Sequence, residues 1–455
     1  MSQMRASVSG GGIRDARQVN VSVVGGGLAG CEAAWALAES GVSVTLFEMR
    51  PELSSPAHET DRLAEIVCSN SFKSVDTSNA HGLLKAELRM LGSLLLTIAD
   101  ETRVPAGSAL AVDRSLFSQR ATELVTSHPN ISVKREEITE LISPAIIATG
   151  PLTSDHLAEV IRERLGIDSL TFFDSIAPIV SAESLDMSVL YPLSRYGKGS
   201  GDDYLNAPLT EAEYRALVEA LLTADQYAAH EFEKTPFFEG CLPVEELARR
   251  GPETLRFGPM KPVGLPDPST GREPYAVVQL RREDNAGQMW NLVGFQTKMR
   301  QQDQGRVLRS IPGLGSADFL RFGSMHRNTY LNAPATLTTH LSTKNDDRLL
   351  FAGQLTGVEG YTESLGTGIL AGHNMVRLLK GRAPKIPPPE TMLGGLLRYV
   401  SEADSDGFQP MNANFGLLPP LESRVRKKRE RKERMAERAL ESMRGFVDEF
   451  LGSEA

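Results

Sequence analysis

Apolar and polar positions near the start of the chain follow the pattern of a strand, a helix and a second strand. Val19–Gly25 is a short apolar run, Leu28–Ser40 is an Ala-rich stretch of helical character, and Val42–Glu48 is rich in β-branched residues. Parallel strands need a long crossover between them, which is usually a helix. The pattern therefore predicts a βαβ unit.

The chain after this unit predicts further elements of the same domain. Asp113 carries a short carboxylate of the kind that caps helices, so we expect a helix from there to about Thr126. The other expected elements are a polar, turn-like stretch at Ile66–Ser78, a helix at Leu83–Ile98, and strands at Ile131–Glu136 and Pro144–Thr149.

The rhythm changes between Leu152 and Arg321, where helices mix with strands joined by Gly- and Pro-rich turns. This mixture predicts an inserted α+β domain. Its expected helices are Asp155–Leu165 and Glu211–Thr223, and its expected strands are Phe172–Val180, Tyr275–Leu280 and Met289–Phe295. Beyond it we expect a buried strand at Leu349–Gly353, a helix at Gly366–Leu379 and a stiff linker at Pro384–Pro389.

Together these elements predict an α/β fold with a doubly wound Rossmann-type domain assembled from two separated segments. We expect a disordered tail at 1–18, the Rossmann segments at 19–151 and 322–383, the inserted α+β domain at 152–321, and a linker with a helical C-terminal region at 384–455.

Composition limits where the protein works. The 455 residues are 41% hydrophobic and 24% charged, as is normal for a soluble globular protein. The longest aliphatic stretch, around Leu94–Ile98, is too short to cross a bilayer, so we expect no membrane association. Three cysteines without a CxxC pair argue against a disulfide framework and against a metal site. A cytoplasmic location is the simplest interpretation.

The net charge of −9 argues against a nucleic-acid partner, but the charge is uneven. The segment Arg424–Arg438 contains nine basic and three acidic residues. Its composition favours a solvated helix with Glu–Arg pairs. A local basic face could also bind phosphates on an acidic protein, because charge interactions are screened within about 10 Å. Both interpretations stay open.

A glycine-rich motif joins the first strand to the first helix. Its residues are Gly25, Gly26, Gly27, Leu28, Ala29 and Gly30, which form GxGxxG. The first glycine permits a tight turn, the second lets the backbone approach a pyrophosphate, and the third lets helix and strand pack closely. Glu48 ends the second strand, where a carboxylate would accept hydrogen bonds from ribose hydroxyls. The motif predicts a dinucleotide site.

Three later segments favour FAD over NAD as the bound dinucleotide. They are Ala148-Thr149-Gly150, Gly353-Gln354 and the glycine-rich stretch from Gly357 to Gly372. The first resembles a strand end of two-domain flavoproteins, the second their strand at the ribityl chain, and the third suits the pyrimidine end of flavin. Gln354 stands where Asp is usual, and an amide can still hydrogen-bond a hydroxyl. No second GxGxxG follows a strand, so NADPH or NADH would bind only transiently.

Longer strings of residues resemble one enzyme family. They are "EMRP", "PAHETD", "EIVCSNS", "VPAGSALAVDR", "IIATGPLTSD", "FFEGCLPVEELARRG", "FGPMKPVGL", "MHRNTYLNAP", "GQLTGVEGYTES" and "FQPMNANFGLLPPL". From about Val19 to about Phe446 the chain resembles the folate- and FAD-dependent tRNA (uracil-5-)-methyltransferases. The departures are modest: Gly27 stands where Ala is common, and Ala207 stands where many relatives have Cys.

The resemblance implies a reaction and its partners. It implies FAD as cofactor, NADPH or NADH as reductant and methylenetetrahydrofolate as carbon donor. The implied substrate is the uridine at position 54 in the T-loop of tRNA, and no DNA is implied. A flavin-dependent enzyme of the glucose-inhibited-division type, which modifies wobble uridines, is the nearest alternative. A non-catalytic flavoprotein that binds RNA is a third.

The chemistry needs a nucleophile and a base, and the matched strings contain two cysteines. C5 of uracil becomes nucleophilic when a thiolate adds to C6, and a second group must then remove the C5 proton. We assign Cys241, which follows a glycine and precedes an expected helix start, as the nucleophile. We assign Cys68 as the base or partner thiol, and the two roles could be exchanged. Cys31 is expected to serve packing only.

Four polar residues are candidates for folate or phosphate contacts: Lys298, His326, Arg327 and Asn328. His326 could stack on a pterin, and Arg327 could pair with a carboxylate or a phosphate. Lone polar residues in loops are more often surface residues than ligands, so the alternative interpretation is solvent exposure. Glu359 and Tyr361, beside the glycine-rich stretch, are further candidates for substrate contact.

Overall fold

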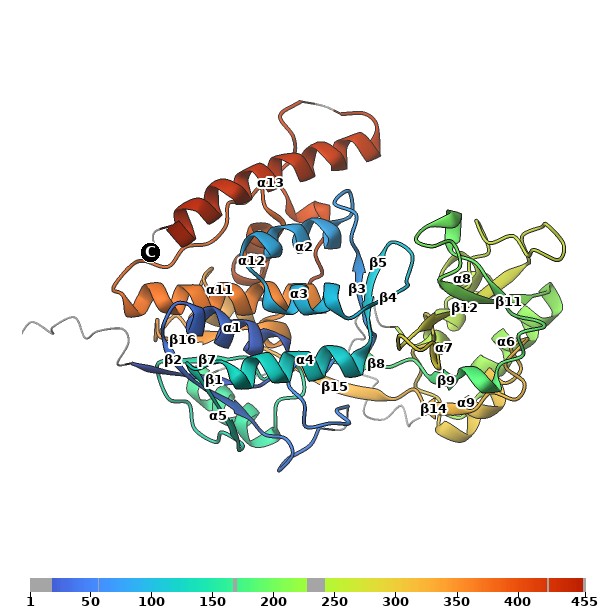
Figure 1. Cartoon of the computed structure of the whole chain (residues 1–455), viewed down its shortest axis with the longest axis horizontal. Coiled ribbons are helices and arrows are strands. Elements are labelled where there is room, and N and C mark those ends of the chain that lie inside the picture. The colour runs from blue at the N-terminus through green and yellow to red at the C-terminus, as the bar shows by residue number, and fades with distance from the viewer. Residues whose placement is uncertain (1–18, 56, 167–169, 227–241, 424, 453–455) are drawn as a thin grey trace, which may run out of the picture.

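The computed structural model describes residues 19–55, 57–166, 170–226, 242–423 and 425–452, without the side chains of 170–175 and 325–327. Two hydrophobic cores organise these residues (Figure 1). The first core is built on a parallel sheet, and the second is built on an antiparallel sheet at the other end of the molecule.

The first sheet has five strands in the order β16-β7-β1-β2-β6, and all its neighbours are parallel. The strands are β1 (Asn20–Val24), β2 (Ser43–Glu48), β6 (Ile131–Arg135), β7 (Ala145–Ile147) and β16 (Leu349–Phe351). The helix α1 (Leu28–Glu39) connects β1 to β2, as the βαβ pattern predicts. Helices cover both faces, with α1 above the sheet and α5 (Asp155–Leu165) below it in Figure 1. This is the predicted doubly wound α/β fold.

The helices α1 and α11 (Tyr361–Leu379), each of which begins at a glycine-rich segment, pack with their backbones in close contact. The helix α11 packs against α1 through two glycines. A Cβ at Gly368 would lie 2.2 Å from the carbonyl oxygen of Ala29, and one at Gly372 would lie 2.8 Å from that of Ala33. Any larger residue would push α11 away from α1.

Two sequence expectations in this region are wrong. The single helix expected at Leu83–Ile98 is two helices, α2 (Ala80–Met90) and α3 (Leu94–Glu101). Gly92 adopts a φ of +77° between them, and Ser93 then caps α3 by accepting from the Leu96 amide. The stretch expected to be turn-like contains a strand, β3 (Ser71–Ser74). With β5 (Ala109–Val112) and β4 (Arg103–Val104) it forms a small antiparallel sheet.

The second sheet has six strands in the order β10-β11-β12-β13-β9-β14. They are β9 (Ile179–Ser181), β10 (Tyr191–Pro192), β11 (Tyr204–Leu209), β12 (Ala276–Arg282), β13 (Met289–Leu292) and β14 (Phe319–Arg321). Its helices are α6 (Glu211–Thr223), α7 (Val244–Arg249), α8 (Thr254–Phe257) and α9 (Gln301–Leu308). A reciprocal capping box between Thr210 and Glu213 fixes the predicted start of α6.

A two-stranded ribbon carries the chain between the two cores. The strand β8 (Leu170–Ser175) pairs antiparallel with β15 (Met325–Tyr330), and Figure 1 shows the pair running from one core toward the other. The single strand expected at Phe172–Val180 is therefore wrong, because β8 and β9 belong to different sheets. Leu157 and Ile161 of α5 belong to the first core, although they lie beyond residue 151.

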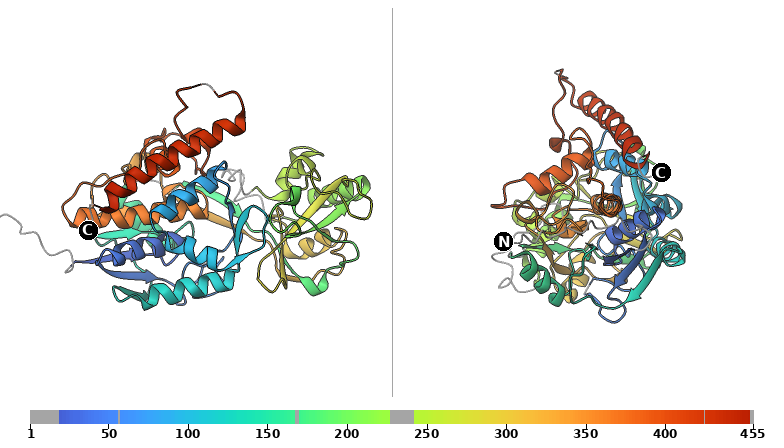
Figure 2. Two further views of the ribbon diagram at one scale, coloured as in Figure 1. Left: turned by 45° about the horizontal axis from the view of Figure 1, so that its top comes forward. Right: turned by 90° about the vertical axis from the view of Figure 1, so that its left-hand side faces the viewer.

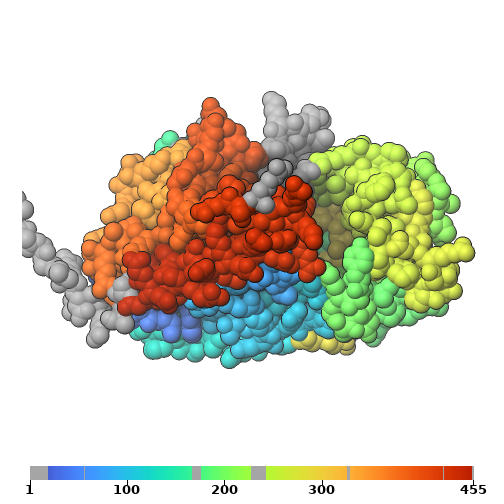
Figure 3. Space-filling model, turned by 90° about the horizontal axis from the view of Figure 1, so that it is seen from above, coloured from blue at the N-terminus to red at the C-terminus, as the bar shows by residue number. Residues whose placement is uncertain are grey.

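The C-terminal region is helical and lies on the first core. The short α10 (Ala333–Thr336) lies between β15 and β16. After α11 come α12 (Met392–Glu402) and α13 (Lys428–Gly452), and both views in Figure 2 show α13 on the outside. Its apolar side, including Met443 and Phe450, is buried in the first core. Seen from above, α13 and the second core face each other across a recess (Figure 3). Across the residues described, no helix is long and apolar enough to span a membrane.

Candidate functional site

The glycine motif forms an open cradle at the start of α1. Gly25 adopts a φ of +103° directly after β1, so the chain turns sharply there. Gly27 is the N-cap of α1, and a Cβ placed on it would meet no atom within 4 Å. The first amides of α1 and the positive end of its dipole therefore face open space. A pyrophosphate group fits such a cradle.

The other glycines of the motif are required for close packing. A Cβ on Gly30 would lie 1.8 Å from the carbonyl oxygen of Gly25, and one on Gly25 would lie 2.5 Å from that of Ala148. A Cβ on Gly26 would meet the side chains of Leu63 and Glu48. The turn therefore cannot hold side chains at these three positions, whereas Gly27 leaves room for a ligand.

Glu48 lies at the end of β2 beside this cradle, and protein donors already satisfy it. Its carboxylate accepts hydrogen bonds from the Gly26 amide at 3.0 Å and from the Arg50 amide and Nε at 3.0 and 2.9 Å. Burial alone would raise the pKa of Glu48, but Arg50 and these amides hold it below its usual value. The carboxylate is therefore charged and fixed in orientation.

A cavity opens above these residues at the carboxyl edge of the sheet. Its lining combines glycine backbone with polar side chains, including those of Glu48, His58, Thr149 and Thr153. Thr149 and Thr153 share a hydrogen bond of 2.6 Å between their hydroxyls, and Gly150 between them has a φ of +69°. Ala148 is buried at the end of β7. The motif of the first strand and the segment Ala148–Gly150 thus meet at one site.

The second Rossmann segment contains Gly353, Gln354 and Gly357, and Gly353 lies next to α1. Gly353 has a φ of +76°, and a Cβ on it would lie 3.0 Å from the Cβ of Ala29. The Gln354 amide donates to the carboxylate of Glu359 at 2.5 Å. Gly357 has a φ of +86° and packs against the ring of Phe408. The backbone here therefore stays close to the cradle, and the polar ends of Gln354 and Glu359 point to a second cavity.

This second cavity has a volume of about 270 Å³ and contains Cys68. Cys68, Asn328 and Gln354 line it together, although they lie far apart in the chain. The remaining lining residues are Ala57, Val67, Ser69, Ser71, Lys73, Pro151, Leu152, Ile176, Arg281, Gln296, Glu359, Gly360, Tyr361 and Asn412. A thiol, amides, a carboxylate and cationic groups thus surround one space between the two cores.

Side chains from distant segments hold the backbone of Cys68 on both sides. The phenol oxygen of Tyr361 accepts from the amides of Cys68 and Ser69, each at 3.0 Å. Arg114 donates to the carbonyl oxygens of Ile66 and Cys68 at 2.8 and 3.0 Å. The backbone of Cys68 is therefore held by α11 and by the start of α4 (Arg114–Ser127).

Arg114 also ties this loop to the second core. Its Nε lies 2.5 Å from the carboxylate of Glu283, which is 1% exposed. From the same sheet, Arg281 donates to Ser69 Oγ and Asn70 Oδ1 at 2.8 and 2.9 Å. The acidic partner raises the pKa of Arg114 beyond its normal range despite burial. Arg114, Arg281 and Lys73 were not among the predicted site residues, although Arg114 ends the matched string "VPAGSALAVDR" and follows the helix cap Asp113.

The remaining predicted site residues have different outcomes. Cys241 lies outside the described residues, and so do the side chains of His326 and Arg327 on β15. Lys298 does not line the Cys68 cavity. Its amine instead forms an ion pair with Glu246 of α7, and its amide donates to Glu245 at 3.5 Å.

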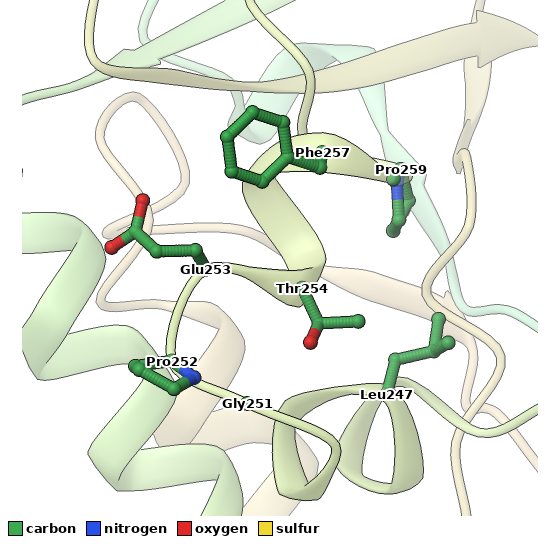
Figure 4. Close-up of a pocket in the computed structure, with 8 residues that line it drawn as sticks. Leu247, Gly251, Pro252, Glu253, Thr254, Phe257 and Pro259 are labelled. Carbon is green, nitrogen blue, oxygen red and sulfur yellow. The ribbon is translucent and has the colours of Figure 1, made fainter.

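A further hollow lies in the second core, between α7 and α8 (Figure 4). Apolar and backbone groups dominate its lining, with Leu247, Thr254 and Pro259 around it and Phe257 at its rim. The one acidic residue there, Glu253, accepts from the Tyr275 hydroxyl at 2.9 Å. Among the residues that the structure describes, none of those proposed for the reaction lines this hollow.

Comparison with known proteins decides the family. A family model described as "Glucose inhibited division protein A" matches residues 20–383. A Geobacter sulfurreducens protein named methylenetetrahydrofolate–tRNA-(uracil-5-)-methyltransferase TrmFO is 58% identical, over 92% of this chain and 97% of the relative. An Aquifex aeolicus protein of the same name is 55% identical, over 94% and 96%. The chain belongs to the TrmFO family.

Solved structures support the fold independently of these names. GidA of Aquifex aeolicus superposes with a TM-score of 0.67 in one crystal form and 0.66 in another. The identities are 18% and 17%, and the superposition covers 94% of this chain but 73% and 76% of GidA. The TrmFO family thus shares its architecture with GidA, and GidA has additional residues outside the common part.

Proposed function

We propose that this chain makes 5-methyluridine at position 54 in the T-loop of tRNA, in the cytoplasm. Methylenetetrahydrofolate would donate the carbon, and NADPH or NADH would be the reductant. The observation that carries the proposal is the placement of Cys68 in a cavity that also contains Gln354, Glu359 and Gly360 of the second Rossmann segment. The names of relatives more than 50% identical to this chain support the same reaction.

FAD fits the residues of the first cavity. The open cradle at Gly27 suits its pyrophosphate, and the carboxylate of Glu48 borders the same space. Thr149, Thr153 and His58 would line the rest of the nucleotide, and Gly353–Gln354 would border the ribityl chain. When bound, FAD would supply the electrons that convert a carbon at the formaldehyde level into a methyl group.

The residues of the chain would activate and hold the uracil. In our scheme the thiolate of Cys241 adds to C6, so that C5 attacks the incoming carbon. Removal of the C5 proton by Cys68 would expel the nitrogen that carried this carbon, and two-electron reduction of the resulting exocyclic methylene would expel the Cys241 thiolate from C6. The exchanged assignment stays open. Arg114 and Tyr361 hold the backbone of Cys68 from both sides, so its thiol would meet the substrate in a fixed position. Asn328 and Glu359 provide hydrogen-bonding groups in the same cavity.

The test uses a tRNA transcript that lacks the methyl group. The protein with FAD and NADPH is incubated with the transcript and either methylenetetrahydrofolate or S-adenosylmethionine, and 5-methyluridine is measured by mass spectrometry. We expect the product only with the folate. Product formed with S-adenosylmethionine alone, or modification at the wobble uridine instead, would contradict the proposal.

A further inference from the structure

Tyr196 is an exposed aromatic residue held in a conformation that L-residues avoid. Its φ and ψ are 59° and 28°, in the left-handed region, and 66% of its surface is exposed. Glycine or asparagine is the usual choice at such a position, and a bulky residue there costs free energy. Burial of the ring does not offset that cost. Strain of this kind often marks a functional site.

The surrounding residues support the ring in this position. Gly264 lies beneath it, and a Cβ there would come within 2.5 Å of the Tyr196 ring. Arg195 holds the segment under the ring, because its guanidinium donates to the carbonyl oxygens of Val263 and Lys261, the latter at 2.7 Å. The face of the ring away from Gly264 is therefore presented to solvent from a rigid base.

Basic and aromatic residues lie near Tyr196 along the chain and in the segment 257–264 against which its ring packs. Lys198 and Lys261 are exposed nearby, and the same segment leads back to Phe257, which is 72% exposed at the rim of the hollow in Figure 4. Hydrogen bonds from Ser78, and then the charges of Arg429 and Lys198, lower the pKa of Asp76. Lys198 and Arg429, at the basic start of α13, thus both lie close enough to Asp76 to interact with its charge.

The loop of Tyr196 also borders the sheet next to the Cys68 cavity. The Tyr204 hydroxyl donates to the carbonyl oxygen of Ala106 at 3.1 Å, and Asp203 accepts from the Gly107 amide at 2.5 Å. Ala106 and Gly107 connect β4 to β5, and β3 of that sheet carries Lys73 into the cavity. An RNA bound in the Cys68 cavity would therefore have this loop on the other side of the same small sheet.

We propose that Tyr196 is a stacking platform for an unpaired base of the substrate RNA, with Lys198 beside it for a phosphate. Aromatic rings next to basic side chains are the usual means of binding unstacked bases. The inference rests on the proposed function, because it takes tRNA as the ligand. It assigns a binding role to a residue outside the cavity and outside the nucleotide site.

Two substitutions separate stacking from structural support. Tyr196→Phe keeps the ring, whereas Tyr196→Asn removes it and introduces a residue that tolerates the left-handed conformation. We expect Tyr196→Asn to bind a T-arm stem-loop transcript at least about fivefold more weakly than the wild type does. Tyr196→Phe should bind like the wild type. A blunt RNA duplex without unpaired bases should bind all three proteins equally. Lys198→Gln should reduce the slope of log K against log salt by about one.

The melting temperature provides the second measurement. If the strain serves binding, Tyr196→Asn melts at or above the wild-type temperature, because the left-handed residue is relieved. Ile142→Asn is the matched control, since Ile142 is similarly exposed on the other core, and it should leave RNA binding unchanged. Wild-type affinity of Tyr196→Asn for the stem-loop would overturn the inference, and so would equal weakening for stem-loop and duplex. If the wild-type protein methylates no transcript at all, the proposed function is contradicted, and this outcome is distinct from a failure of the Tyr196 inference.

Discussion

At the scale of single residues, two glycines of one motif should respond in opposite ways to a side chain. Gly27→Leu places its side chain in open space, so the fold should survive with a change of roughly 0.5 kcal/mol or less. The same side chain fills the pyrophosphate cradle, so the purified protein should be colourless. Flavin absorbance and thermal melting measure the two effects.

Gly30→Ala is the contrasting variant. Its Cβ would lie 1.8 Å from the carbonyl oxygen of Gly25, so we expect loss of the folded protein rather than loss of FAD alone. A yellow Gly27→Leu protein with bound FAD would show that the cradle does not hold the pyrophosphate.

The two cysteines have separable effects in our scheme. With tRNA containing 5-fluorouridine, the wild type should form a covalent adduct, because fluorine cannot leave as a proton. Cys241→Ala should form none and should still bind FAD. Cys68→Ala should lose turnover and keep the adduct, and a gel shift measures both. If Cys68→Ala loses the adduct while Cys241→Ala retains it, the two roles are exchanged.

The sequence predicts those residues whose role is visible within a short motif. The glycines of the cradle, Glu48 and Cys68 belong to this group, and the structure gathers the described ones at two adjoining cavities. Tyr361 and Arg114 hold Cys68 across sequence separations of 293 and 46 residues. No local pattern encodes such a contact. Arg114 could therefore be recognised only after the strands had been placed.

At the scale of elements, the predictions are wrong where the backbone changes direction within a stretch that was expected to be continuous. The predicted bounds of α6, Glu211–Thr223, are confirmed, and its capping box of Thr210 and Glu213 is a local signal in the sequence. The break between α2 and α3 was missed, although Gly92 and Ser93 mark it. Tertiary contact supports this break, since Glu32 of α1 accepts from the amide of Leu95 at 2.9 Å. The expected domain boundaries stay a prediction.

The docking of α12 predicts an unusual dependence on pH. Glu87 of α2 is buried and accepts from the amides of Met392 and Leu393 at 2.7 and 2.9 Å. Burial raises the pKa of Glu87 to about 8. The unfolded chain loses this proton near pH 4.5 and the folded chain only near pH 8, so stability falls as pH rises through that window. Glu87→Gln should reduce this fall in chemical denaturation, and part of it should remain because burial also raises the pKa of Glu32, to about 7. Glu402→Gln, at an exposed site, should retain all of it.

The basic helix α13 has two possible roles that salt can distinguish. Pairs of Arg429 with Glu433 and of Arg434 with Glu430 support a solvated helix, yet the side chain of Arg429 remains 87% exposed. If this face binds tRNA phosphates, neutralising Arg426, Lys427, Lys428 and Arg429 reduces the slope of log K against log salt by roughly one per lost contact. An unchanged slope would show that this segment does not contact tRNA phosphates and is a solvated helix surface.

At the scale of the whole molecule, a buried ion pair between Arg114 and Glu283 joins the two cores beside the backbone of Cys68. Arg114→Met would leave Glu283 buried without its partner, which costs about 3–5 kcal/mol in comparable cases. It would also release the carbonyl oxygen of Cys68, so methylation should fall while FAD binding persists. Denaturant titration and turnover measure the two effects. Arg120→Met, at an exposed pair of the same helix, is the control and should change neither.

In the sequence, the second core lies between β8 and β15, so it is an insertion in the chain that forms the first core. Strands β9 to β14 end at Arg321, whereas β16 of the first sheet begins only at Leu349. During synthesis from the N-terminus, the inner unit is thus completely outside the ribosome before the outer sheet receives its last strand. Because domains fold as units as they emerge, the inner core can form first and bring β8 and β15 together. The strand β16, which is synthesised last, can then pair with β7 after only a short segment of chain has been ordered.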